Sequence, residues 1–155
     1  MRTTYCDGWS ILKKSPWKSI DKATALENHN SKVPYTAIIH DDDNNVTHVI
    51  EITKEYVLVY FMNKFTSPYL IYDFEVKDNN DIFLTAVSCN DYDEKSNEKL
   101  GTIDLSFEEN GDIFIAKWDR ITGEFVELEN KADTKPNWDK FPEFGKYDHL
   151  LVEER

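Results

Sequence analysis

Seven apolar or aromatic residues follow one another without a polar interruption from Tyr56 to Met62. The run is too short to span a membrane, and its β-branched and aromatic residues favour a strand that is covered on both faces. The flanking segments show the period-2 pattern of strands that bury one face. The positions that alternate are Val46, His48, Ile50 and Ile52 before the run, and Leu70, Tyr72, Phe74 and Val76 after it. The stretch from Val46 to Phe74 therefore predicts a central strand between half-buried neighbours.

Similar strand-like segments recur with polar turns between them and no helical interruption. We expect a mainly β (α+β) fold, an antiparallel β-meander that forms a curved sheet or a partly closed barrel. The Asn110-Gly111 pair is the strongest hairpin signal and predicts a type I′ turn. The eight expected strands are 35–40, 46–53, 56–62, 69–77, 82–89, 100–108, 112–118 and 124–128.

The length of 155 residues predicts a single domain, 1–155, with three parts. Residues 1–34 form an N-terminal arm and a short helix, which we expect from Ser19 as N-cap to Asn28. Residues 35–128 form the β-meander. Residues 129–155 are rich in aromatic side chains, and we expect this C-terminal segment to pack on the sheet.

The charge of the chain limits its partners. The sequence has 18 Lys and Arg against 30 Asp and Glu, a formal net charge of −12. Such a surface repels phosphates, which opposes binding to nucleic acid or to an anionic membrane. A basic protein is the natural partner, although acidity also serves solubility alone. Residues 1–34 carry six basic and three acidic residues, a net +3, so the remainder carries −15.

The cysteines and the N-terminus indicate a cytoplasmic protein. Cys6 and Cys89 belong to no Cys-x-x-Cys pair, and two reduced thiols are commoner than one long-range disulfide in a reducing compartment. The first residues lack the apolar run of a signal peptide.

No motif predicts catalysis, a metal or a cofactor. Asp41, Asp43 and Asn45 alternate as in an EF-hand loop, but Val46 and Ile52 occupy the places that need Gly and Glu. His40 and His48 flank one expected hairpin and could approach each other, without a metal-site spacing. The sequence has no nucleophile elbow and no phosphate-binding glycine loop, and its many carboxylates single out no acid–base pair. We therefore expect a protein that is not an enzyme and has no metal or cofactor.

Acidic residues cluster at four expected turns, close to aromatic residues such as Tyr92, Phe107 and Phe114. The clusters are Asp41 to Asp43, Asp78 with Asp81, Asp91 to Glu94, and Glu108 to Asp112. In protein interfaces buried aromatic side chains supply hot-spot area, and the surrounding charges steer the encounter and set the choice of partner. Solvated turns beside ordinary core aromatics are the simpler interpretation of any single cluster. The candidate contacts with a partner are Asp41, Asp42, Asp43, Asp91, Asp93, Glu94, Glu108, Glu109 and Asp112.

Taken together, the chain resembles bacterial immunity proteins of contact-dependent and polymorphic toxin systems. The resemblance lies in size, acidity, β-rich build, absence of catalytic motifs and the aromatic-acidic tail around 137–145. It implies that the protein binds a cognate toxin domain, often a basic nuclease, and blocks its active site or substrate cleft. The alternative is a small-ligand carrier with the meander closed into a barrel, which the bulky side chains of the expected strands disfavour because they would fill it.

Overall fold

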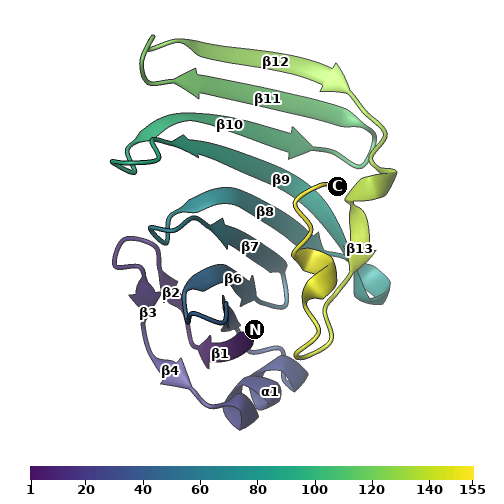
Figure 1. The fold of residues 1–155 in the computed structure, drawn as a ribbon. Coiled ribbons are helices and arrows are strands. Elements are labelled where there is room, and N and C mark those ends of the chain that lie inside the picture. Colours follow the sequence, from purple (N-terminus) through teal and green to yellow (C-terminus); the bar gives the residue numbers. More distant parts are fainter.

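An open, curved antiparallel sheet dominates the computed structural model, which describes residues 1–155 (Figure 1). Its strands are hydrogen-bonded in the order β12-β11-β10-β9-β8-β7-β6-β5-β1-β4, and β13 pairs with β9. The sheet does not close into a barrel, so the curved-sheet expectation is confirmed and the closed form is wrong. The strands are β1 (Arg2–Cys6), β4 (Ser19–Ile20), β5 (Tyr35–His40), β6 (Val46–Ile52), β7 (Tyr56–Met62), β8 (Pro68–Val76), β9 (Asp81–Tyr92), β10 (Lys99–Phe107), β11 (Asp112–Asp119), β12 (Phe125–Lys131) and β13 (Trp138–Lys140).

Short elements complete the single domain. A two-stranded hairpin, β2 (Trp9–Ser10) and β3 (Ser15–Pro16), lies outside the main sheet. The one α-helix is α1 (Lys22–Asn30), and the 3-10 turns are η1 (Asp78–Asn80), η2 (Lys135–Asn137) and η3 (Asp148–Leu150). None of the helices is long and apolar enough to cross a membrane.

The predicted meander is confirmed, because β5 to β12 are eight consecutive strands, each paired with the next. The apolar run is β7, between β6 and β8. Val57, Val59 and Phe61 are fully buried on the concave face of the sheet, and Tyr60 and Met62 are buried on the convex face. Both faces of this strand are therefore covered, as the absence of alternation indicated.

The N-terminal region differs from the expectation. The predicted helix start at Ser19 is wrong, because Ser19 pairs with Cys6 in the β4–β1 ladder. The helix N-cap is Asp21, whose Oδ1 accepts a hydrogen bond from the Thr24 amide at 2.7 Å. An Asp side chain accepts hydrogen bonds from the free amides of the first turn as well as Ser does. Asp21, which is two residues closer to the apolar Ala25, can therefore serve as the N-cap in place of Ser19.

The β10–β11 turn also differs. Gly111 has φ +96° and its amide donates to the Glu108 carbonyl at 3.0 Å, but Asn110 does not have a positive φ. The predicted type I′ turn is therefore wrong. A turn with ordinary φ at Asn110, followed by a left-handed glycine, matches the longer hairpin loops that add a G1 bulge.

We expect Gly111→Ala to lower the free energy of unfolding by about 2 kcal/mol or more, because an L residue is strained at this φ. A Cβ at this position would also lie 2.7 Å from the Ala132 carbonyl oxygen. Gly123→Ala is the matched control: Gly123 has φ +69° but nothing within 4 Å of its would-be Cβ. Urea unfolding should show the larger loss at Gly111, and equal losses would contradict the close-approach argument.

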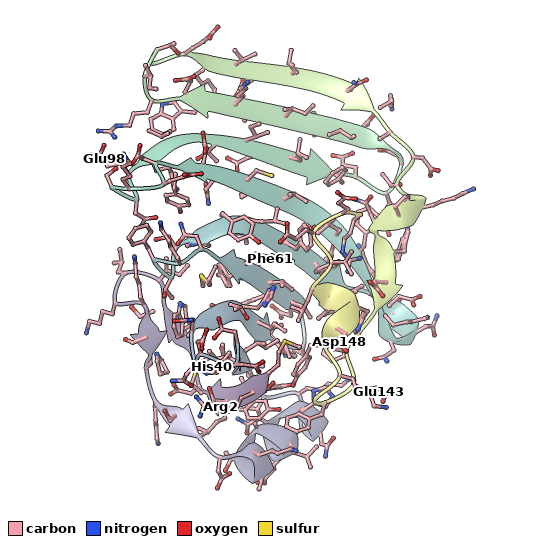
Figure 2. The ribbon with its side chains drawn as sticks, viewed as in Figure 1. Arg2, His40, Phe61, Glu98, Glu143 and Asp148 are labelled. Carbon is pink, nitrogen blue, oxygen red and sulfur yellow. The ribbon has the colours of Figure 1, made fainter.

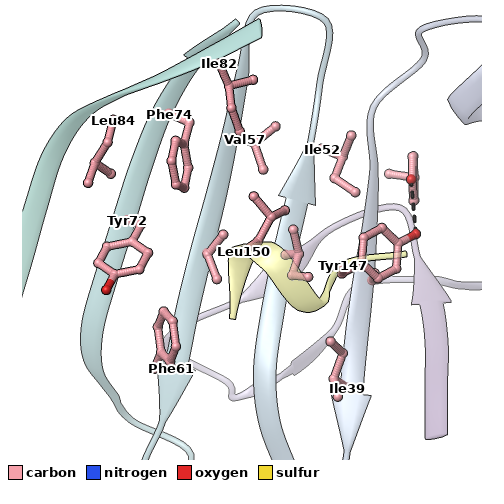
Figure 3. Packing of buried hydrophobic residues seen from close by; sticks show 14 of the residues in the cluster. Ile39, Ile52, Val57, Phe61, Tyr72, Phe74, Ile82, Leu84, Tyr147 and Leu150 are labelled. Carbon is pink, nitrogen blue, oxygen red and sulfur yellow. Dashed lines mark hydrogen bonds between the residues drawn. The ribbon is translucent and has the colours of Figure 1, made fainter. Parts of the chain in front are cut away.

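The concave face holds the main core, which the helix and the C-terminal segment cover. Ala25 of α1 and Tyr147 and Leu150 of the tail are buried among the strand residues. Figure 3 shows Tyr147 and Leu150 directed at the strands. The Tyr147 hydroxyl lies 3.3 Å from the Tyr35 hydroxyl. Tyr147 and Leu150 thus hold the C-terminal segment against the concave face of the sheet.

A smaller core lies on the convex face under the N-terminal hairpin. Its buried members are Cys6, Trp9, Ile38, Val49, Tyr60 and Met62. The β2–β3 hairpin brings Trp9 onto this face. Lys14, which directly precedes β3, donates a hydrogen bond from Nζ to the Phe65 carbonyl at 2.7 Å. The two cores together include buried residues of β1 and of β5 to β9, and this covering fixes where an exposed sheet surface remains.

Two histidines make the stability of this core depend on pH. Burial lowers the pKa of His29, which shares a 2.9 Å hydrogen bond with Tyr35, and of His48, which lies edge-on to Phe61. Their stabilising contribution is complete above the unfolded pKa near 6.5 and is lost as pH falls toward the folded values, because only the unfolded chain binds the proton readily.

We therefore expect the urea midpoint to fall more between about pH 7.5 and about pH 5.5 in the native chain than in a His29→Gln, His48→Gln double variant. An equal fall in both chains would show that carboxylates alone set the pH dependence.

Candidate functional site

Strands β10, β11 and β12 extend beyond the part of the sheet that the helix and the tail cover (Figure 1). No residue of these three strands is fully buried, although the sequence gives them large apolar side chains. Phe114 is 42% exposed, Trp118 37%, Phe125 60% and Leu128 58%. An exposed apolar sheet of this kind marks an interaction surface more often than an ordinary surface.

The register sets which side chains share the convex face of these strands. Ala116 of β11 lies between Asp104 of β10 and Glu127 of β12. One row along, Phe114 is opposite Glu129, and on the other side Trp118 is opposite Phe125. We call this surface the acidic-aromatic face and define it as Asp104, Phe114, Trp118, Phe125, Glu127 and Glu129.

The acidic-aromatic face has a local hollow at its centre, because the side chains there are small. Ser106 and Ala116 lie between the larger residues, and a shallow hollow of about 500 Å³ opens there. Carboxylates of Asp104, Glu127 and Glu129 line it together with Phe114. A hollow with an aromatic wall and a charged rim can receive one large side chain of a partner and surround it with charge.

The three carboxylates of this face have no basic partner in the chain. Asp104 accepts a hydrogen bond from Ser88 Oγ at 2.5 Å, and none of the three takes part in a salt bridge. The nearby Lys131 at the end of β12 is paired with Asp112. The negative charge of this face is thus not neutralised within the chain. An approaching cation is attracted to carboxylates that have no other cationic partner.

The acidic groups predicted from the sequence lie at the two ends of the sheet. Asp41–Asp43 are in the β5–β6 turn and Asp91–Glu94 are at the β9–β10 turn, on the same end because the strands alternate in direction. Glu108–Asp112 are at the opposite end. Figure 2 shows Glu98 of the β9–β10 turn at one end, with Glu143 and Asp148 of the tail near the other. The three groups do not form one surface.

Several of these carboxylates already serve the turns. Hydrogen bonds from the side chain and backbone of Asn45 lower the pKa of Asp41, and backbone amides of Ser96 and Lys95 lower that of Asp93. Such bonds within a turn stabilise its local conformation.

Other predicted acids are paired with cations, and four remain free. Asp42 lies 3.0 Å from the N-terminal ammonium, and Glu109 lies 3.8 Å from Lys77 Nζ. The side chain of Lys131 lowers the pKa of Asp112. Asp43, Asp91, Glu94 and Glu108 make no hydrogen bond or salt bridge with their side chains and stay available to a partner.

The histidines and cysteines do not assemble a reactive group. His48 is opposite Ile39, so His40 lies on the other face of the strand pair. His40 Nε2 is 2.9 Å from Thr4 Oγ1. Cys6 and Cys89 are free thiols, and burial raises the pKa of Cys6 to about 11. No three His, Cys, Asp or Glu side chains lie close enough together to hold a metal ion.

The acidic-aromatic face was missed by sequence reasoning. A signal was present in β11, where Ile113 and Ile115 have one parity and Phe114, Ala116 and Trp118 have the other, so the strand is apolar on both faces. The partner acids lie on two other strands, and only the register shows that Asp104 and Glu127 flank the same residue.

Comparison with known proteins gives no relative. No protein-family model matches the sequence, and no curated protein or solved structure matches the chain.

Proposed function

We propose that this protein binds and inhibits a basic partner protein through the acidic-aromatic face, as an immunity protein inhibits a toxin domain. The observation that carries the proposal is the combination, on one exposed surface, of three aromatic side chains with three carboxylates that have no internal cation. Large aromatic side chains supply binding energy, and uncompensated charges determine which partner approaches.

The charge of the chain supports a basic partner. With a net charge of −12 the protein attracts cationic surfaces from a distance and repels nucleic acid. A nuclease toxin presents a basic cleft to phosphate groups, and carboxylates can enter that cleft with charge-assisted hydrogen bonds. The proposed action is occlusion: the inhibitor occupies the cleft and the substrate cannot. It requires no catalytic group, metal or cofactor of this chain.

The main contact with the partner would lie on strands β10 to β12, not at the acidic turns. The free carboxylates Asp43, Asp91 and Glu94 lie at the end of the sheet that carries the β5–β6 and β9–β10 turns, outside the acidic-aromatic face. They add to the long-range attraction, while Phe114, Trp118 and Phe125 provide the contact area. We place the protein in the cytoplasm, where Cys6 and Cys89 would remain the free thiols seen here.

The carrier alternative loses its architectural basis. The sheet is open, and Tyr147 and Leu150 of the tail fill its concave side. A cleft of about 510 Å³ lies beside the end of α1 and the loop at Phe141–Glu143, and only five of its 17 lining residues are hydrophobic. A lipid or other apolar ligand would find no enclosed apolar cavity there.

Co-expression with the product of the adjacent upstream gene tests the proposal. We expect a one-to-one complex and suppression of that product's toxicity in growing cells. A variant with Phe114→Ala, Trp118→Ala and Phe125→Ala should lose the protection while retaining the cooperative unfolding of the native chain. Undiminished protection by this variant would contradict the assignment of the acidic-aromatic face.

A further inference from the structure

The last strand of the sheet, β12, has a long free edge. It spans seven residues and pairs only with β11, in a register without a bulge from Asp112↔Lys131 to Trp118↔Phe125. The opposite edge is blunted, because β4 has only two residues. Proteins usually protect such edges with prolines, bulges or lysines, and β12 carries a single lysine at its end.

The hydrogen bonds show which backbone groups of β12 are free. The Ala132 amide donates to the Gly111 carbonyl, and the Asp119 amide donates to the Glu124 carbonyl, both within the β11–β12 ladder. In an antiparallel pair the bonded residues alternate, so residues 126, 128 and 130 face β11. The amides and carbonyls of Phe125, Glu127, Glu129 and Lys131 therefore point away from the sheet.

The concave face beside this edge is apolar. Val126 and Leu128 of β12 share it with Ile113 and Ile115 of β11 and continue the main core past β9. The chain itself places no segment over them, because the tail crosses the sheet at β8, where the Tyr72 hydroxyl donates to the Glu153 carbonyl at 2.7 Å. A further strand on β12 would extend both faces at once.

Charge argues against a second copy of this chain as that strand. Only residues whose amide and carbonyl groups are free can form hydrogen bonds across this edge. In a pair of two β12 strands, odd-numbered residues must therefore lie opposite odd-numbered residues. Each antiparallel register that joins five or more residues of β12 to its copy sets a glutamate opposite a glutamate: Glu127 with Glu127, Glu127 with Glu129, or Glu129 with Glu129. Like charges directly opposite each other destabilise a strand pair.

We propose that β12 receives an extended strand of the partner, in which Lys or Arg alternates with apolar residues. The basic side chains would lie opposite Glu127 and Glu129 on the convex face, and the apolar ones would lie beside Val126 and Leu128 on the concave face. This strand addition rests on the proposed function, since it states how the basic partner is held. It explains why the acidic-aromatic face borders the only long free edge of the sheet.

Amide exchange measured by NMR, with a designed probe, tests the inference. The probe is a cyclic β-hairpin peptide whose outer strand alternates Lys and Val, and the control peptide has Glu in place of each Lys. In the free protein we expect fast exchange at Phe125, Glu127, Glu129 and Lys131 and slow exchange at residues 126, 128 and 130. The Lys peptide should protect the first set, and the Glu peptide should not.

A pair of substitutions separates the backbone from the charge. Glu127→Pro removes one outward amide and leaves the β11 ladder intact, since proline is tolerated where an edge N–H faces solvent. Glu127→Gln removes the same charge and keeps the amide. We expect the Pro variant to bind the Lys peptide about tenfold more weakly than the Gln variant. Unchanged slow exchange at residues 126 and 128 confirms that the Pro variant is folded.

Each other result would overturn the strand addition. Equal affinities of the two variants, or peptide shifts at Trp118 and Phe114 without protection of the outward amides, would leave the proposed function standing without strand pairing. Absence of saturable shifts up to about 1 mM Lys peptide would overturn it as well, since specific complexes are tighter than that. Protection that rises with protein concentration alone would identify a second copy as the occupant.

Discussion

Replacing Asp104, Glu127 and Glu129 together by lysine should weaken binding of the partner recovered by co-expression about 100-fold or more at low salt. The three carboxylates have no cation of their own, so their reversal turns an attractive surface into a repulsive one without breaking an internal salt bridge. Most of the loss should appear in the association rate and should shrink as salt is added, because salt screens the steering between exposed charges. Surface plasmon resonance at two salt concentrations measures both effects.

A second triple variant controls for net charge. Asp43, Asp91 and Glu94 are exposed, make no salt bridge and lie away from the acidic-aromatic face. Their reversal to lysine changes the net charge by the same amount. We expect it to slow association modestly and to leave the dissociation rate unchanged. If the two triple variants behaved alike, net charge alone would govern binding and the acidic-aromatic face would have no special role.

Leu150→Ala is expected to lower the free energy of unfolding by about 3 kcal/mol, the usual loss for removing a fully buried leucine side chain. Leu150 has no exposed surface and joins the tail to the strands of the concave core. Leu12→Ala is the matched control, since Leu12 is 95% exposed and the same atoms are removed from solvent-facing surface. Urea unfolding of both variants checks the difference.

A small effect of Leu150→Ala, similar to that of Leu12→Ala, would mean that the tail detaches at little cost. The concave face would then be open in solution, and the argument that the tail excludes an apolar ligand would fail. The large expected value therefore also bears on the carrier alternative.

The sequence predicted most of the sheet, because a meander depends on local signals. Alternation along 46–53 and 69–77 and the unbroken run at 56–62 identified the strands near the core, and polar turns separated them. It did not predict β1, since Arg2-Thr3-Thr4 gives no apolar alternation and the strand forms only by pairing with β5. Long-range pairing of β1 with β4 also explains why Ser19 lies in a strand and not in the expected helix.

The candidate site was less predictable for the same reason. Acidic turns are visible along the chain, and the sequence pointed to them. The acidic-aromatic face combines three strands, and a shift of one residue in either register would have turned Asp104 or Glu127 to the concave side. Phe114 and Trp118 are exposed because no other segment packs over β11. A strand that is apolar on both faces predicts a buried strand until the fold is known.

Carboxyl footprinting of the complex would test the central claim most directly. Carbodiimide labels exposed carboxylates, and mass spectrometry reports the labelling of each one in the free protein and in the complex with its partner. We predict that Asp104, Glu127 and Glu129 lose reactivity on binding, while Asp43, Asp91 and Glu94 keep most of theirs. Protection of the turn carboxylates with unchanged labelling of Asp104, Glu127 and Glu129 would contradict the account and return the interface to the ends of the sheet.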